Sequence, residues 1–224
     1  MSAAPNSPSR ARAFEVRHLQ LARALFAALA AIMVTFSSDH SAAVGLSVFS
    51  GWAIATAIVF LVAAWQVYTA GSRVVPVVLG VLTLVAGMVA GLPGIRSTTL
   101  FFALVITWSL ITGLVELVSG IRGRGADEHA RDAILVGSLT IALGLGLLVV
   151  NPAYSLEYFN RTVGEGGTLT GITIGVGIFG GYAAIIAVFL GIAGFSPRRL
   201  PAAPAAPSET DAGPGRAEAA GEPA

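Results

Sequence analysis

The chain has 224 residues, of which 55% are hydrophobic and 11% are charged, and its formal net charge is +1. A soluble domain carries about 25% charged residues, and one of this length cannot bury so much apolar surface. The composition therefore excludes an ordinary soluble domain, and the small net charge argues against a nucleic-acid partner. It predicts an all-α membrane protein whose main partner is the lipid bilayer.

The sequence also lacks several kinds of chemical group. It contains no cysteine and no lysine, which excludes disulfides, thiol nucleophiles and Schiff-base lysines. No Walker loop, G-x-S-x-G elbow or H-E-x-x-H motif is present. The three histidines, His18, His40 and His129, lie too far apart for a metal site of helical spacing. We therefore expect no enzymatic activity, no cofactor and no metal.

Two polar tails flank an apolar region. Residues 1–18 and 196–224 are rich in small, polar and proline residues, which predicts disordered cytoplasmic segments. Residues 19–195 form the predicted transmembrane domain, since a spanning helix needs about 20 mainly apolar residues. The six predicted helices cover 22–38, 51–70, 74–92, 99–120, 132–151 and 168–194. A cleaved signal peptide is the alternative for the first helix, although its basic region would exceed about twenty residues.

Arginine placement predicts the orientation of the helices. Eleven of the 13 arginines lie before or at the start of the first helix, between the second and third, between the fourth and fifth, or after the sixth. The other two, Arg96 and Arg161, lie in the alternate loops. Because basic residues accumulate in cytoplasmic loops, we expect both termini inside and the loops near 39–50, 92–98 and 152–167 outside.

Two helix pairs share a sequence pattern. The segment W-A-I-A-T beginning at Trp52 matches W-S-L-I-T beginning at Trp108, at an offset of 56 residues. The pattern G-x-L-T-x-x-x-G begins at both Gly80 and Gly137, at an offset of 57 residues. These matches predict a duplicated two-helix unit, with chance recurrence of common membrane residues as the alternative. The corresponding position in the last helix is assigned to Ile172.

The fourth and fifth helices carry a family resemblance. Residues 108–117 read WSLITGLVEL, and residues 134–152 read ILVGSLTIALGLGLLVVNP ahead of a glycine-rich last helix. In these segments, and over roughly residues 20–195, the chain resembles the HdeD family of bacterial acid-resistance membrane proteins. The resemblance implies six spanning helices as three hairpins, a place in the bacterial inner membrane and a link to survival in acid. It implies no known catalytic residue.

Glycines recur at spacings that let helices approach closely. Small residues four apart form a groove against which another backbone packs. The glycines assigned to helix packing are Gly80, Gly87, Gly91, Gly137, Gly144, Gly167, Gly171, Gly175, Gly177 and Gly181. Packing within one six-helix bundle is the favoured interpretation, and packing between copies in a homo-oligomer is the alternative.

Glu116 is the one acidic residue in the interior of a predicted span, away from its first residue. An intramembrane carboxylate is a candidate functional residue. Its place near the inner end of the fourth helix would let it reach the interface, with Arg122 or Arg124 as its partner. This favours an anchoring role, in which glutamine would also serve, over proton handling. The sequence predicts no pair of charged residues within the membrane.

Two functions fit these observations. The first is a non-enzymatic membrane protein that supports the envelope under acid stress, with His40 among the outer groups that would change charge in acid. The second is a small oligomeric transporter or channel, which would need a polar path through the bundle. The candidates for that path are Thr83, Thr107, Thr112 and Thr140, although such hydroxyls usually bond their own helix backbone.

Overall fold

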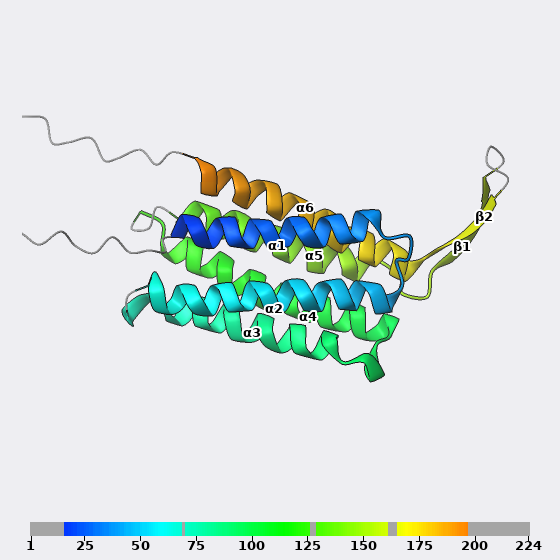
Figure 1. Ribbon diagram of the computed structural model, residues 1–224, viewed down its shortest axis with the longest axis horizontal. Coiled ribbons are helices and arrows are strands. Elements are labelled where there is room, and N and C mark those ends of the chain that lie inside the picture. The colour runs from blue at the N-terminus through cyan, green and yellow to red at the C-terminus, as the bar shows by residue number, and fades with distance from the viewer. Residues whose placement is uncertain (1–15, 69, 126–128, 161–164, 197–224) are drawn as a thin grey trace, which may run out of the picture.

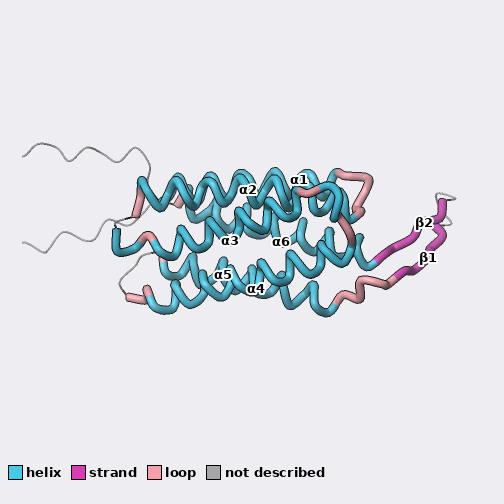
Figure 2. Tube along the Cα trace, turned by 90° about the horizontal axis from the view of Figure 1, so that it is seen from below, coloured by secondary structure: helices cyan, strands magenta, loops and turns pink. Residues whose placement is uncertain are grey.

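The computed structural model describes residues 16–68, 70–125, 129–160 and 165–196. In these segments six long helices lie side by side, with their axes along the same direction (Figures 1 and 2). They are α1 (Val16–Phe36), α2 (Ala42–Gln66), α3 (Val74–Gly91), α4 (Thr98–Arg122), α5 (Ala130–Val149) and α6 (Gly171–Phe195). Each is long and apolar enough to cross a bilayer, which confirms the predicted all-α class with six spans.

Two helices, α1 and α2, begin at least six residues earlier than predicted. α1 begins at Val16, so the last three residues of the predicted disordered segment 1–18 are helical, whereas residues 1–15 lie outside the described residues, as does 197–224. α2 begins at Ala42 rather than at 51, because the Ser41 side chain caps it by accepting a hydrogen bond from the Val44 backbone N–H at 3.4 Å. Small and polar residues in this first part of α2 obscured its start.

The helices form a closed ring. Each helix packs on its neighbours in chain order, and α6 returns to pack on α1. Packing is closest in three pairs, α2 with α3, α4 with α5, and α1 with α6, while weaker packing joins the pairs to one another. Two of these pairs are sequential hairpins joined by short turns (η1, Ala70–Ser72, lies in the α2–α3 connection), whereas the third joins the first and last helices. The ring therefore depends on contact between the two ends of the domain.

Buried residues recur in register along the even-numbered helices. They are Leu46, Phe49, Trp52, Thr56 and Phe60 in α2, Phe102, Val105, Trp108, Thr112 and Glu116 in α4, and Val176, Phe179, Tyr182, Ile186 and Leu190 in α6. In this register the residue of α6 that is equivalent to Trp52 and Trp108 is Tyr182. Ile172 was assigned to that position from the sequence, and the burial pattern corrects this assignment. The aromatic side chains of α2, α4 and α6 thus meet at the centre of the bundle.

The odd-numbered helices show a matching burial pattern. The buried residues are Ala24, Ala27, Ala30, Ala31 and Val34 in α1, Gly80, Thr83, Ala86, Gly87 and Ala90 in α3, and Gly137, Thr140, Leu143, Gly144 and Leu147 in α5. Small residues dominate these positions, which lets each odd helix approach its even partner closely. By burial, the bundle consists of three comparable pairs, α2–α3, α4–α5 and α6–α1.

One end of the bundle carries a short β-hairpin. Strands β1 (Ser155–Asn160) and β2 (Glu165–Thr170) pair antiparallel and project beyond the helices (Figure 1). They occupy most of the predicted outer loop 152–167, so α6 begins at Gly171, where the Thr170 side chain caps it. We call this the hairpin end of the bundle. The opposite end, where α1 begins and α6 ends, is the terminal end.

Candidate functional site

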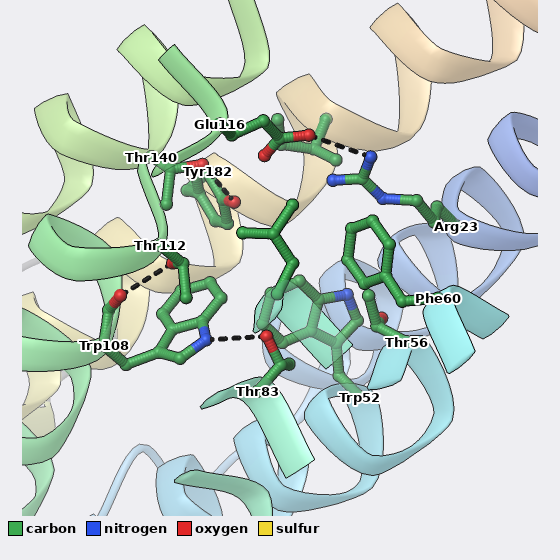
Figure 3. A pocket seen from close by; sticks show the side chains of 12 residues that line it. Arg23, Trp52, Thr56, Phe60, Thr83, Trp108, Thr112, Glu116, Thr140 and Tyr182 are labelled. Carbon is green, nitrogen blue, oxygen red and sulfur yellow. Dashed lines mark hydrogen bonds and ion pairs between the residues drawn. The ribbon is translucent and has the colours of Figure 1, made fainter. Parts of the chain in front are cut away.

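An ion pair crosses the interior of the bundle. Nη1 of Arg23 in α1 lies 3.1 Å from Oε1 of Glu116 in α4, and the two side chains are only 13% and 11% exposed. The Arg23 guanidinium also lies over the ring of Phe60 in α2, 4.4 Å from its centroid, a cation–π contact. α1 and α4 are not neighbours in the ring, so the pair joins opposite sides of the bundle through its centre (Figure 3).

This pair corrects two predictions from the sequence. The partner of Glu116 is Arg23, whereas Arg122 and Arg124 are exposed at the terminal end. A pair of charged residues does lie inside the bundle, where none was predicted. The reason is that Glu116 follows Trp108 and Thr112 along one buried face of α4 and therefore points to the centre. Arg23, expected from the sequence at the boundary of the first helix, lies about two turns inside α1.

A small polar cavity adjoins the ion pair on the side of the hairpin end. We call it the inner cavity; it measures about 20 Å³. It is lined by Arg23, Trp52, Thr56, Phe60, Leu79, Thr83, Trp108, Thr112, Glu116, Thr140, Tyr182 and Ile186. Three of the four threonines proposed for a polar path line it, and Thr107 does not. Its volume exceeds the roughly 10–15 Å³ that one water-sized occupant needs.

The hydroxyl groups of the inner cavity are held by specific hydrogen bonds. The Trp108 indole N–H donates to Thr83 Oγ1 at 3.1 Å, and Thr112 donates to the Trp108 carbonyl at 2.7 Å. Thr140 Oγ1 lies 2.9 Å from the Tyr182 hydroxyl. Thr56 differs, because its buried Oγ1 is the side-chain polar atom without a hydrogen-bond partner among the described residues. An unsatisfied buried hydroxyl is costly, so a bound group in this cavity would stabilise it.

A larger cavity, the vestibule, lies between the ion pair and the terminal end. It measures about 240 Å³ and shares Arg23, Phe60, Leu79 and Glu116 with the inner cavity. Its remaining polar lining comprises Gln20, Tyr68, Ser72, Ser119, His129 and Asp132. Gln20 Nε2 donates to Asp132 Oδ2 at 2.6 Å across its wall. The Arg23–Glu116 pair therefore stands between the two cavities.

Aromatic rings close the inner cavity toward the hairpin end. Phe49 packs edge-on against Trp108 and Phe179, with centroids 5.3 Å and 5.6 Å apart, and Trp52 packs edge-on against Trp108 at 5.2 Å. Such edge-to-face packing is favourable and leaves few voids. Access to the inner cavity thus leads through the vestibule and past the ion pair.

Both charged residues depart from the burial pattern of the bundle. In the burial pattern of the even-numbered helices, the residues equivalent to Glu116 are Phe60 in α2 and Leu190 in α6. The position of Arg23 is taken by Leu79 in α3 and Val136 in α5. The bundle therefore tolerates apolar residues at these places, and a buried ion pair is no better for stability than well-packed apolar residues. The pair is thus a candidate for function rather than for packing.

The glycines assigned to packing divide into three groups. A Cβ atom added at Gly80, Gly87, Gly91, Gly137, Gly144, Gly171 or Gly175 would lie within about 3 Å of a neighbouring residue. Gly167 lies in β2, not in the last helix, so the helical spacing proposed from Gly167 to Gly171 is wrong. A Cβ atom at Gly177 or Gly181 would meet nothing within 4 Å among the described residues, so these two do not pack against any of the other five helices.

Neither histidines nor carboxylates gather into a metal site in the described part of the chain. The comparisons with known proteins add no assignment. No protein-family model, no curated protein and no solved structure matches the chain. The geometry is that of a multi-pass membrane protein with a buried ion pair between two cavities.

Proposed function

We propose that this chain is a non-enzymatic protein of the bacterial cytoplasmic membrane that supports survival under acid or envelope stress through proton uptake at Glu116. The observation that carries the proposal is the Arg23–Glu116 pair, which lies inside the bundle beside a polar cavity and borders a vestibule. The resemblance to the HdeD family supports the link to acid, and the arginine distribution supports cytoplasmic termini. In this orientation the vestibule opens to the cytoplasm.

A small oligomeric transporter or channel is the second candidate. It is favoured by the shared lining of the two cavities, because displacement of the ion pair would join them into one polar path. A homo-oligomer would have its contact on a surface that this chain leaves open, and the face of α6 that bears Gly177 and Gly181 has that property. The aromatic closure toward the hairpin end would have to open in such a protein.

The orientation is tested by cysteine labelling, for which the cysteine-free sequence is well suited. Ser41→Cys, before α2 at the hairpin end, should react with a membrane-impermeant thiol reagent in intact cells. Ser72→Cys, in η1 at the terminal end, should react only after the membrane is opened. The reverse pattern would show that the termini lie outside. Thr162, in the predicted outer loop 152–167, is a second outer position for labelling and lies outside the described residues.

The role of Glu116 is tested by complementation at low external pH. Glu116→Gln should be expressed and folded, yet it should fail to restore acid survival of a deletion strain, because glutamine cannot take up a proton. This expectation replaces the interfacial anchoring role inferred from the sequence, whose arginine partners were wrong. Glu157→Gln, the same change on exposed strand β1, is the control and should restore survival fully. Rescue by a well-folded Glu116→Gln protein would refute the proposed proton uptake.

A further inference from the structure

Arg23 requires a counter-charge under all conditions. A guanidinium stays protonated across the accessible pH range, even when it is buried. Its counter-charge in the bundle is Glu116, and an uncompensated buried charge is strongly unfavourable. When Glu116 is neutralised by a proton, Arg23 therefore has to find another anion or leave its site. The surrounding residues determine which of these two outcomes has the lower free energy.

Three features favour entry of an anion. The inner cavity beside Arg23 has room for an occupant the size of a water molecule or a halide ion. The hydroxyl of Thr56, buried and without a partner among the described residues, is a donor that an anion would satisfy. The vestibule supplies a route from the terminal end to the guanidinium. The cation–π contact with Phe60 meanwhile holds the Arg23 guanidinium in place when Glu116 is neutral.

The other groups near Glu116 do not supply the missing charge. Arg23 faces it from α1 and Tyr182 faces it from α6, while α2 and α3 contribute the apolar Phe60 and Leu79. Asp132 and His129, from the start of α5, line the vestibule. Asp132 already accepts a hydrogen bond from Gln20 at 2.6 Å on the vestibule wall. In the described part of the chain, the carboxylate within 4 Å of the guanidinium is that of Glu116.

We propose that the inner cavity binds a small monovalent anion of halide size when Glu116 carries a proton. The proton comes from water at the terminal end and is held on a carboxylate oxygen of Glu116, and the anion takes the place of that carboxylate beside Arg23. One positive and one negative charge enter together, so the net charge of the site is unchanged. This inference rests on the proposed proton uptake at Glu116 and adds a second ligand, the anion, that binds together with the proton.

Bromide is the probe, because it quenches indole fluorescence on contact. Trp52 and Trp108 line the inner cavity, and the exposed Trp65 is removed by Trp65→Phe, which serves as the background for all variants. Purified protein in detergent is titrated with sodium bromide against sodium gluconate at constant ionic strength. In this background Glu116→Gln should show saturable quenching at pH 7. Its bromide affinity should be at least about tenfold tighter than that of the Glu116 protein, since a full negative charge beside the site is gone.

Two controls make the result decisive. Arg23→Gln combined with Glu116→Gln should abolish saturable quenching, because the cation is lost while the cavity remains. The Glu116 protein should gain saturable quenching as the pH is lowered, and this measurement stands even if a variant misfolds. Absence of saturable quenching at low pH overturns the anion site, as does equal quenching in the double variant. If acid survival still depends on Glu116 in that case, the proposed function stands without its anion.

Discussion

Replacing Glu116 with leucine should destabilise the protein by about 3–5 kcal/mol, the usual loss when one partner of a buried ion pair is removed. Arg23 would be left charged, since a guanidinium cannot be neutralised, and its side chain is only 13% exposed. Arg23→Leu should cost less, because the remaining Glu116 can take up a proton and become neutral. The asymmetry between the two single variants is therefore part of the expected result.

The double variant Arg23→Leu with Glu116→Leu is the matched control. Its two positions then resemble their apolar equivalents, Leu79 in α3 and Leu190 in α6, so stability should return to within about 1 kcal/mol of wild type. The free energy of unfolding of the two single variants and the double variant is measured by circular dichroism in mixed detergent micelles. Equal, small losses in both single variants would mean that water reaches the pair and screens it, contrary to the burial described above.

Gly137→Leu should prevent α4 and α5 from packing, at a cost of at least about 1–3 kcal/mol. A Cβ atom at Gly137 would lie 2.5 Å from the backbone nitrogen of Leu117 and 2.8 Å from the carbonyl of Gly113. Backbone atoms of a helix cannot move aside as a flexible side chain can, so the helices would have to separate. Gly113 faces Gly137 in return, with its own Cβ position 2.9 Å from the Gly137 carbonyl.

Gly177→Leu is the control for this change. It makes the same substitution in an apolar helix, but nothing lies within 4 Å of the added Cβ atom, so stability should change by no more than about 0.5 kcal/mol. Yield of folded protein and thermal stability in detergent measure both variants. A stable Gly137→Leu protein would show that the α4–α5 contact is looser than described. A loss of oligomer in Gly177→Leu alone would instead identify the open face of α6 as a contact between copies.

The number of helices and the all-α class were predictable from composition. A long apolar run in a bilayer forms an α-helix, because there every backbone polar group needs a partner within its own segment. The start of α2 did not follow. Gly45, Ser47 and Ser50 lower the apolarity of its first turns, yet Ser50 is satisfied by donating to the Gly87 carbonyl of α3 at 2.7 Å. That compensation is a tertiary contact, which a window of apolar residues does not contain.

Only one of the two residues of the ion pair was predicted from the sequence. Glu116 stood out because a carboxylate in an apolar run is expensive. Arg23 was missed, since a basic residue near the start of a helix normally marks the membrane boundary and its partner lies 93 residues away in the chain. One local signal was available. Ala27, Ala30 and Val34 follow Arg23 along the same side of α1, so the arginine heads a buried stripe and not a lipid-facing one.

The pairing of α1 with α6 bears on how the protein is made. α1 has its closest packing partner in α6, so the ring of six helices cannot close until synthesis has passed Phe195, where α6 ends. Until α4 is inserted, α1 must keep Arg23 in the bilayer without Glu116, a state that snorkelling toward the nearer headgroups would relieve. The pairs α2–α3 and α4–α5 can assemble meanwhile from local contacts, which form fastest. Closure of the ring therefore comes after the synthesis of α6, when α1 gains its closest packing partner.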